Sequence, residues 1–159
     1  RNGLKFFAKE CGLAHEDIIT ILQNAAQCPV VECDGAKAQK YDLMERYCHH
    51  LRKKIRLELG GENQPLKGMH VVVDAGNGAG GFFATQILGR LGADTTGSVF
   101  LEPDGHFPNH IPNPENKQAM AAIKKAVLDS HADLGLIFDT DVDRMSAVLK
   151  NGQEINRHL

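Results

Sequence analysis

The sequence predicts an α/β fold: a three-layer α/β/α domain with a mostly parallel sheet and a C-terminal hairpin. Three observations support this prediction. Short, continuous apolar runs at 70–73 and 134–138 are typical of strands that are covered on both faces. Segments with apolar residues at helical spacing separate these runs. Asn151-Gly152, which lies between two short apolar segments, is a strong signal for a hairpin turn.

The first part of the chain predicts a short strand and two helices. Residues 4–7 are expected to form the strand, and 16–26 a helix with acidic residues in its first turn. No clear period follows between 29 and 40. A second helix is indicated by Leu43, Tyr47, Leu51 and Ile55, whose four-residue spacing lays them along one side. We expect this helix to end at Gly60-Gly61, before a linker.

From Met69 onward, strands and helices alternate in a β-α-β-α-β pattern. Glycines separate the first strand from the next helix, and a proline-containing loop precedes the last helix. In chain order the expected elements are a strand at 70–73, a helix at 82–91, a strand at 95–101, a loop at 102–116, a helix at 117–130, a strand at 134–138, and hairpin arms at 145–149 and 153–155.

Three unusual segments follow the three expected strands: 76–81, 102–116 and 139–144. Strands joined through helices are normally parallel, with right-handed crossovers, so their following turns emerge at one edge of the sheet. Open α/β sheets bind ligands at that edge. The sequence therefore predicts a site where these segments meet.

The last of the three segments contains alternating carboxylates. Asp139, Asp141 and Asp143 directly follow the buried run that ends at Phe138, and Arg144 follows them. Carboxylates at this spacing repel one another, and one arginine offsets only part of the repulsion. A bound cation would offset the rest. Oxygen ligands alone select a hard ion, so we expect Mg²⁺ first, then Ca²⁺ or Mn²⁺.

Two other interpretations compete for the same loop. An EF-hand fails, because its sixth and twelfth positions require Gly and Glu where this chain has Arg144 and Lys150. A haloacid-dehalogenase-type phosphatase uses the first Asp of an Asp-x-Asp motif as its nucleophile, which would be Asp139 here. Against it, Asp143 replaces the small residue of that motif, and the motif comes late in the chain. This phosphatase remains the alternative enzyme.

The glycine turn has its own alternative. Residues 76–81 satisfy the pattern of a dinucleotide-binding turn, and Glu102 lies where an acid would bind the ribose. A nucleotide-binding or assembly module is thus the alternative that is not an enzyme. The simpler interpretation is a tight turn whose glycines let the next helix begin close to the sheet. His106 and His110 in the long loop are candidates for phosphate or metal binding, although a structural role suits them better.

Composition excludes several classes of protein. A hydrophobic content of 42% and a net charge of -2 indicate a folded chain without a basic field, so we expect neither nucleic acid nor membrane as partner. The basic side of the helix after residue 42 is expected to be a solvated face. The four cysteines lack the spacing of a zinc site and are expected to be reduced thiols, which favours a cytoplasmic location; an organellar location also remains open.

Three segments in order, VDAGNGAGG, PDGHFPNHIPNPEN and FDTDVDR, resemble the second domain of the α-D-phosphohexomutases. The resemblance extends from Tyr41 to the C-terminus, and RNGLKFF resembles the strand after that family's catalytic serine loop. It implies two parts: residues 1–40 as the C-terminal remnant of domain 1, and 41–159 as domain 2 with the metal-binding loop. The serine loop would precede Arg1, so we expect a fragment that is inactive alone.

The resemblance also implies roles for residues. Asp139, Asp141 and Asp143 would hold Mg²⁺, and Arg144 would lie beside the phosphoserine. Lys5 corresponds to the family's active-site lysine in an Asn-Gly-x-Lys segment, proposed for proton transfer. The implied reaction interconverts hexose 1-phosphate and hexose 6-phosphate through the phosphoserine, and the implied partners are a hexose phosphate and the remaining domains of the same chain. The sequence departs from the family at Thr140 and Val142, where many members have Gly and Ala.

Overall fold

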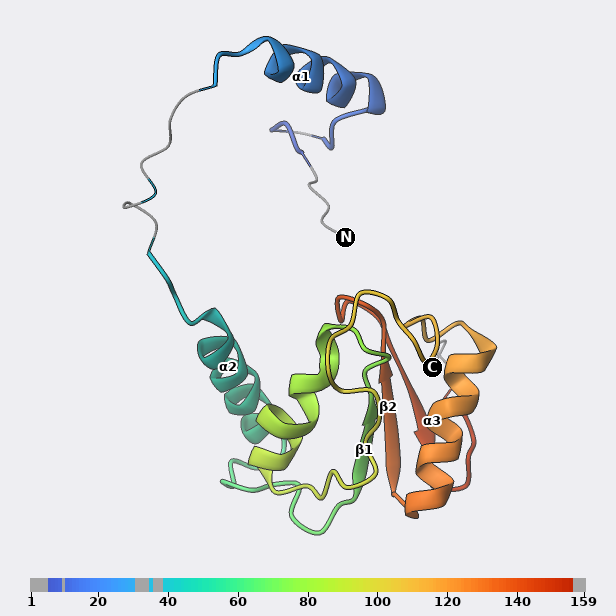
Figure 1. Cartoon of the computed structure of the whole chain (residues 1–159). Coiled ribbons are helices and arrows are strands. Elements are labelled where there is room, and N and C mark those ends of the chain that lie inside the picture. The colour runs from blue at the N-terminus through green and yellow to red at the C-terminus, as the bar shows by residue number, and fades with distance from the viewer. Residues whose placement is uncertain (1–5, 10, 31–34, 36–38, 156–159) are drawn as a thin grey trace. The chain divides into compact units, whose positions relative to one another are not determined.

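The computed structural model describes residues 6–9, 11–30, 35 and 39–155 (Figure 1). Its contacts divide the chain into two compact units, Arg1–Tyr41 and Asp42–Leu159. The three-stranded sheet and the three segments of the expected site all belong to the second unit.

In the described part of the first unit, α1 (His15–Gln27) is one residue longer at each end than predicted. The carboxylate of Asp17 accepts the backbone N–H of Ala14 at 3.0 Å, which caps the start of the helix. None of its 13 residues is buried. Half of the strand predicted at 4–7 lies outside the described residues, and Phe7 forms a single antiparallel bridge with Gly12.

The second unit is built on a three-stranded sheet in the order β1-β2-β3. β1 (Val71–Asp74) is parallel to β2 (Leu134–Phe138), and β2 is antiparallel to β3 (Met145–Leu149). The α/β class is thus confirmed, but the sheet is mixed where we predicted a mostly parallel one. The difference arises because β2 connects to β3 through the short segment 139–144, and a short connection makes neighbouring strands antiparallel.

Apolar residues alternate between the two faces of the sheet. Val72, Ile137 and Val148 pack with Ile123 and Val127 of helix α3 (Lys117–Ser130). On the other face, Val71, Val73 and Phe138 pack with Ala84 and Leu88. Figure 1 shows α3 on one side of the sheet and the segment 79–91 on the other, which gives the predicted layered arrangement.

The bounds of α3 agree with the prediction. Its N-cap, Asn116, accepts the backbone N–H groups of Gln118 and Ala119 at 2.8 and 3.2 Å. Its C-cap, His131, adopts a left-handed conformation with φ of 54°. Both ends of α3 are therefore defined by capping residues that are next to the helix in the sequence.

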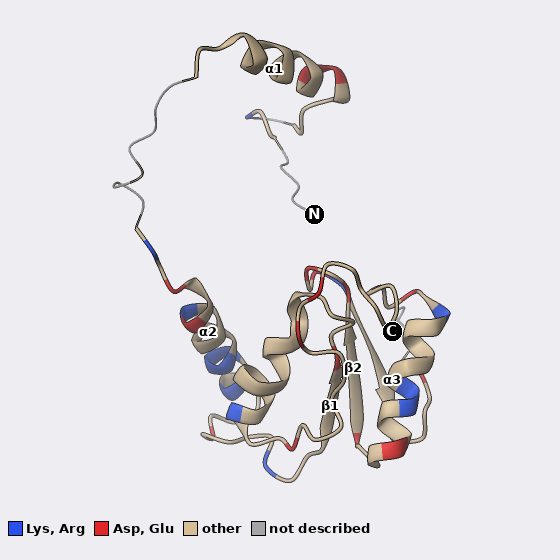
Figure 2. Cartoon of the chain, in the orientation of Figure 1, with Lys and Arg blue, Asp and Glu red and all other residues tan. Residues whose placement is uncertain are grey.

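Helix α2 (Leu43–Glu58) begins at the capping carboxylate of Asp42 and ends close to the predicted glycine pair. Figure 2 shows the basic residues of this helix, and Lys53 and Lys54 are exposed as expected for a solvated face. Arg52 was predicted to lie on that face, but it is only 7% exposed. Its guanidinium bonds the carboxylate of Glu45 at 3.2 Å and the backbone carbonyl of Gln86 at 2.8 Å.

The helix predicted at 82–91 forms as two short pieces, the π-helical η3 (Phe83–Leu88) and the 3₁₀ turn η4 (Gly89–Leu91). A further 3₁₀ turn, η2 (Ala79–Gly81), precedes them in the glycine segment. The carbonyl of Gln86 is bonded by Arg52 of α2. A side chain that bonds a backbone carbonyl of a helix is a recognised cause of local distortion, and the wide π-helical turn of η3 is consistent with this contact.

The strand predicted at 95–101 is reduced to one parallel bridge, Val99 with Asp74, and Asp94 just before it forms another with His70. A turn interrupts the segment, because Gly97 has φ of 88° and Phe100 has φ of 54°. Beside the turn, the hydroxyl of Ser98 accepts the N–H of Val73 at 2.9 Å. A side-chain oxygen thus takes the place that a backbone carbonyl of a neighbouring strand would have.

The C-terminal hairpin forms around Asn151-Gly152. Leu149 N–H donates to the Gln153 carbonyl at 2.9 Å, and Gly152 has φ of 81°. The second arm pairs through one bridge, Val148 with Glu154, so it is shorter than the strand we predicted at 153–155.

The two units provide a test of local stability. Because α1 has no buried residue and α3 has four, we expect the backbone amides of α1 to exchange with solvent hydrogen faster than those of α3. Residue-resolved hydrogen exchange on the whole chain measures this. Equal protection in both helices would contradict it.

Candidate functional site

The acidic loop 139–144 is closed by its first and last residues. The N–H of Asp139 donates to the carbonyl of Arg144 at 3.1 Å. In return, the N–H and the Nε of Arg144 each donate to a different carboxylate oxygen of Asp139 at 3.0 Å. Because Asp139 directly follows β2 and Arg144 directly precedes β3, these three bonds fix the loop to the ends of both strands.

Burial differs along the loop, and the electrostatics follow it. Asp139 is only 2% exposed, whereas Asp141 and Asp143 are exposed. Burial raises the pKa of Asp139, but hydrogen bonds from Arg144 and Asp143 outweigh it and bring the pKa below its usual range. The hydrogen bond to Asp139 and the charges of Asp139 and Asp141 raise the pKa of Asp143. The neighbours of Asp143 thus disfavour its ionised form.

The three carboxylates meet at one place, as predicted. One oxygen from each of Asp139, Asp141 and Asp143 lies within 4.8 Å of the other two. Oxygens on opposite sides of Mg²⁺ are roughly 4.2 Å apart, and the distance is about 4.6–5.2 Å for Ca²⁺. Oxygens that lie within 4.8 Å of one another can therefore share one hard divalent cation of either kind. The side chains of Asp141 and Asp143 are exposed and can adjust to the ion, so the donor set fits a hard divalent cation.

The glycine turn contacts the acidic loop directly. The N–H of Ala79 donates to the carbonyl of Thr140 at 2.9 Å. At Gly78, a Cβ atom would lie 2.8 Å from that same carbonyl oxygen, which is closer than real Cβ contacts. The glycine is needed here for a close approach of two backbones, which is the simpler of our two interpretations of the turn.

The long loop 102–116 joins the other two segments. Asn109 donates its side-chain amide to Asn77 in the glycine turn at 2.7 Å, and Asn77 donates to the carbonyl of Glu102 at 2.8 Å. At its other end, Asn113 accepts a long 3.4 Å contact from Nη1 of Arg144. The predicted convergence at one edge of the sheet is therefore observed. Asn77, Asn109 and Asn113 lie in the segments that carry the family resemblance, but sequence reasoning gave none of them a role.

The two histidines of this loop differ. His106 is exposed and pairs with Asp104, whose carboxylate contacts the ring Nδ1 at 2.9 Å. His110 is 5% exposed, and its ring contacts the fully buried carboxylate of Asp74. Neither histidine belongs to the carboxylate group, and Asp74 was not predicted as a site residue. Lys5, the other predicted catalytic residue, lies outside the described residues.

Val142 has an unfavourable backbone conformation, with φ of 68°. A β-branched residue is rarely found in this left-handed region, and the cost is about 1–3 kcal/mol. Its side chain packs with the apolar cluster that contains Phe83 and Phe138. The strained residue therefore lies between two metal-ligand candidates and is held by contacts with the core.

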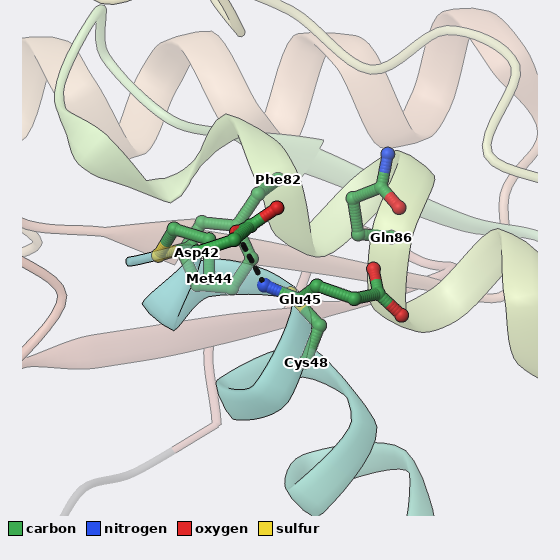
Figure 3. Close-up of a pocket in the computed structure, with 6 residues that line it drawn as sticks. All are labelled: Asp42, Met44, Glu45, Cys48, Phe82 and Gln86. Carbon is green, nitrogen blue, oxygen red and sulfur yellow. Dashed lines mark hydrogen bonds between the residues drawn. The ribbon is translucent and has the colours of Figure 1, made fainter. Parts of the chain in front are cut away.

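A separate cavity of about 310 Å³ lies at the start of α2 (Figure 3). Its acidic side chains already serve the fold: Asp42 accepts the N–H of Glu45 at 3.2 Å, and Glu45 bonds Arg52. Burial raises the pKa of Cys48, which makes this thiol a weak nucleophile. We therefore assign no chemistry to this cavity.

Residues 45–152 match the model of one protein family, described as phosphoglucomutase/phosphomannomutase, alpha/beta/alpha domain II. The match covers the whole sheet and all three segments of the site. The chain belongs to this family. The recognition made from the three sequence segments is thus confirmed, and membership decides against the phosphatase and nucleotide-binding alternatives.

Similar proteins include named mutases of this family. A phosphoglucomutase of Neisseria meningitidis serogroup B is 33% identical over 161 residues, which cover 97% of this chain and 32% of that protein. A phosphomannomutase/phosphoglucomutase of Pseudomonas putida is 32% identical over 95% of this chain and 30% of its own length. A crystal structure of a family protein from Burkholderia thailandensis has a TM-score of 0.62 and 32% identity, covering 74% of this chain and 24% of that one.

The relatives are much longer than this chain, which spans about a third of the length of the curated proteins it matches. The matched region lies inside the predicted second domain, whereas the assignment of residues 1–40 to a first domain stays a prediction. Among the described residues, no helix combines the length and the apolar character needed to cross a membrane.

The contact at Gly78 allows a direct test. Gly78 has φ of -85°, which alanine adopts without strain, so Gly78→Ala adds only close contacts, chiefly with Thr140. We expect a loss of roughly 1–3 kcal/mol in the free energy of unfolding, measured by urea denaturation. Gly105→Ala is the control, because nothing lies within 4 Å of its added Cβ. Similar denaturation midpoints for both variants would contradict the close approach.

Proposed function

We propose that this chain is the metal-binding domain of a phosphohexomutase, together with the end of the preceding domain. The complete protein would interconvert hexose 1-phosphate and hexose 6-phosphate through a phosphoserine. The observation that carries the proposal is the group of three carboxylates, within 4.8 Å of one another and with Asp139 bonded to Arg144, in a chain that matches domain II of this family.

The donor set supports Mg²⁺ as the cofactor. Asp139, Asp141 and Asp143 would hold the ion through carboxylate oxygens, which are the ligands that hard cations prefer. When bound, the ion would neutralise negative charge on the phosphoryl group during transfer. Asp139 keeps one oxygen bonded to the backbone and one to the side chain of Arg144, so the buried ligand is oriented before the ion arrives.

Arg144 is suited to contact a phosphate. Its Nε is bonded to Asp139, so the guanidinium is held at one corner while its two Nη groups can donate to anionic oxygens. The bond to Asp139 also raises the pKa of Arg144, which keeps the side chain charged. We propose that Arg144 lies beside the phosphoserine and that Lys5 transfers a proton, as the family resemblance implies.

The complete protein would contain more than this chain. The phosphoserine would be supplied by a segment before Arg1, and further domains would contact the sugar and its second phosphate. The relatives, about three times as long as this chain, support such domains. We propose a cytoplasmic location and expect this chain to be inactive by itself.

Cation binding can be measured on this chain alone. We expect isothermal titration with Mg²⁺ to give a saturable heat that Asp141→Asn abolishes, because this change removes one of three ligands. Glu62→Gln is the control, since it removes the same charge from an exposed residue outside the carboxylate group. Equal heats from Asp141→Asn and the unchanged chain would rule out the metal site.

The mutase activity requires the complete protein. We expect Arg144→Lys to lower kcat/KM for hexose phosphate by on the order of 10²-fold, because lysine keeps the charge but loses the forked geometry. Arg90→Lys, at an exposed position in η4, serves as the matched control. If both variants retained full activity, Arg144 would have no role in phosphate contact.

A further inference from the structure

The guanidinium of Arg144 contacts acceptors from two different parts of the fold. Its Nε donates to Asp139, which follows β2, at 3.0 Å, and its Nη1 donates to Oδ1 of Asn113 in loop 102–116 at 3.4 Å. The side chain of Arg144 is 54% exposed, so packing does little to fix it. Two acceptors on different nitrogens define the plane of a flat group, which one acceptor does not.

The backbone of Asn113 is held by its neighbours. Its carbonyl accepts the N–H of Asn116, the N-cap of α3, at 2.9 Å. Two buried prolines, Pro112 and Pro114, flank it and restrict the backbone on both sides. The acceptor that contacts Arg144 therefore belongs to a stiff segment, although the contact itself is long.

Two donors determine the orientation of the Asn113 amide. The N–H of Glu115 donates to Oδ1 at 3.0 Å, and Nη1 of Arg144 approaches the same oxygen. An amide nitrogen cannot accept a hydrogen bond, so only the oxygen can occupy this position. The same turn bond occurs at Asn151, whose Oδ1 accepts the N–H of Gln153 at 3.0 Å, but Asn151 follows the other end of β3. The bond to Arg144 is therefore the feature that is specific to the site.

We propose that Asn113 is a positioning residue that sets the plane of the Arg144 guanidinium, so that this group meets a phosphate in one orientation. Asn113 does not belong to the carboxylate group. The consequence for phosphate contact rests on the proposed function, whereas the ordering of the guanidinium does not. Phosphoryl transfer depends chiefly on positioned charge, so a guanidinium that turned freely would stabilise the transferring group less.

The first test uses the unmodified chain without Mg²⁺ or phosphate. Nitrogen NMR follows the rotation of each guanidinium about its Nε–Cζ bond. We expect slower rotation at Arg144 than at Arg90, an exposed arginine in η4, because Asn113 holds Nη1. The bond from Nε to Asp139 leaves this rotation possible, so slow rotation reports on the contact with Asn113. Equal rates at Arg144 and Arg90 would overturn the proposal.

The second test compares two changes at Asn113 by the same measurement. Asn113→Ala removes the acceptor, so rotation at Arg144 should become as fast as at Arg90. Asn113→Asp keeps an acceptor at the same place and should keep the slow rotation. Asn151→Ala is the matched control, because it removes the same kind of turn bond away from Arg144. Slow rotation retained in Asn113→Ala, or lost in Asn151→Ala, would overturn the proposal.

The third test measures activity of the complete protein with hexose phosphate. We expect Asn113→Ala to lower kcat/KM roughly tenfold, the low end of what a hydrogen bond to a charged group contributes, and Asn113→Asp to retain most of the activity. In an Arg144→Lys background, Asn113→Ala should have almost no further effect, because lysine has no planar group to orient. Equal losses in both backgrounds would show a role that does not act through Arg144, which would overturn the proposal.

Failure of this proposal and failure of the proposed function give different results. If the complete protein is an active mutase but Asn113→Ala changes neither the rotation nor kcat/KM, the proposed function stands and the role of Asn113 is wrong. If rotation at Arg144 is slow and depends on Asn113 but the complete protein has no mutase activity, the ordering stands and the proposed function is wrong. The rotation rates of the unmodified chain decide the ordering even if Asn113→Ala does not fold.

Discussion

The reciprocal bonding of Asp139 and Arg144 is the constraint on which the site depends. It connects the end of β2 to the start of β3, and it takes both oxygens of the buried carboxylate. The segment between these two residues is too short to bury its own carboxylates, so Asp141 and Asp143 remain at the surface near Asp139. The three carboxylates are thus brought together by the connection between β2 and β3. The glycine turn and the long loop then contact this connection.

Much of the fold could be predicted from local signals. The bounds of α3 and β2 follow from apolar periodicity and from capping by Asn116, which are properties of neighbouring residues. The π-helix η3 and the interrupted strand after Gly92 could not be predicted in this way. In each case a distant side chain bonds the backbone: Arg52 takes the carbonyl of Gln86, and Ser98 accepts from Val73. Such contacts exist only after the chain has folded, so no window of sequence contains them.

The candidate site, like the fold, could be predicted only in part. The spacing of Asp139, Asp141 and Asp143 predicted the carboxylate group, because alternating acids after a buried strand repel one another unless a cation lies among them. Asp74, Asn77 and Asn113 were assigned no role, since single polar residues acquire one only from the partners that the fold brings to them. The positive φ of Val142 was also invisible, because its cause is packing against residues far away in the sequence.

The conformation of Val142 makes the arrangement of the three carboxylates depend on the folded domain. A free peptide with the sequence of residues 139–144 would lack the core contacts that hold this valine, and the valine would relax to a negative φ. Its carboxylates would then no longer converge. The arrangement therefore belongs to the folded domain as a whole and cannot be transplanted into another protein as a short linear motif. A glycine at position 142 would adopt the positive φ without help from the core, so a loop with that glycine would depend less on the rest of the domain.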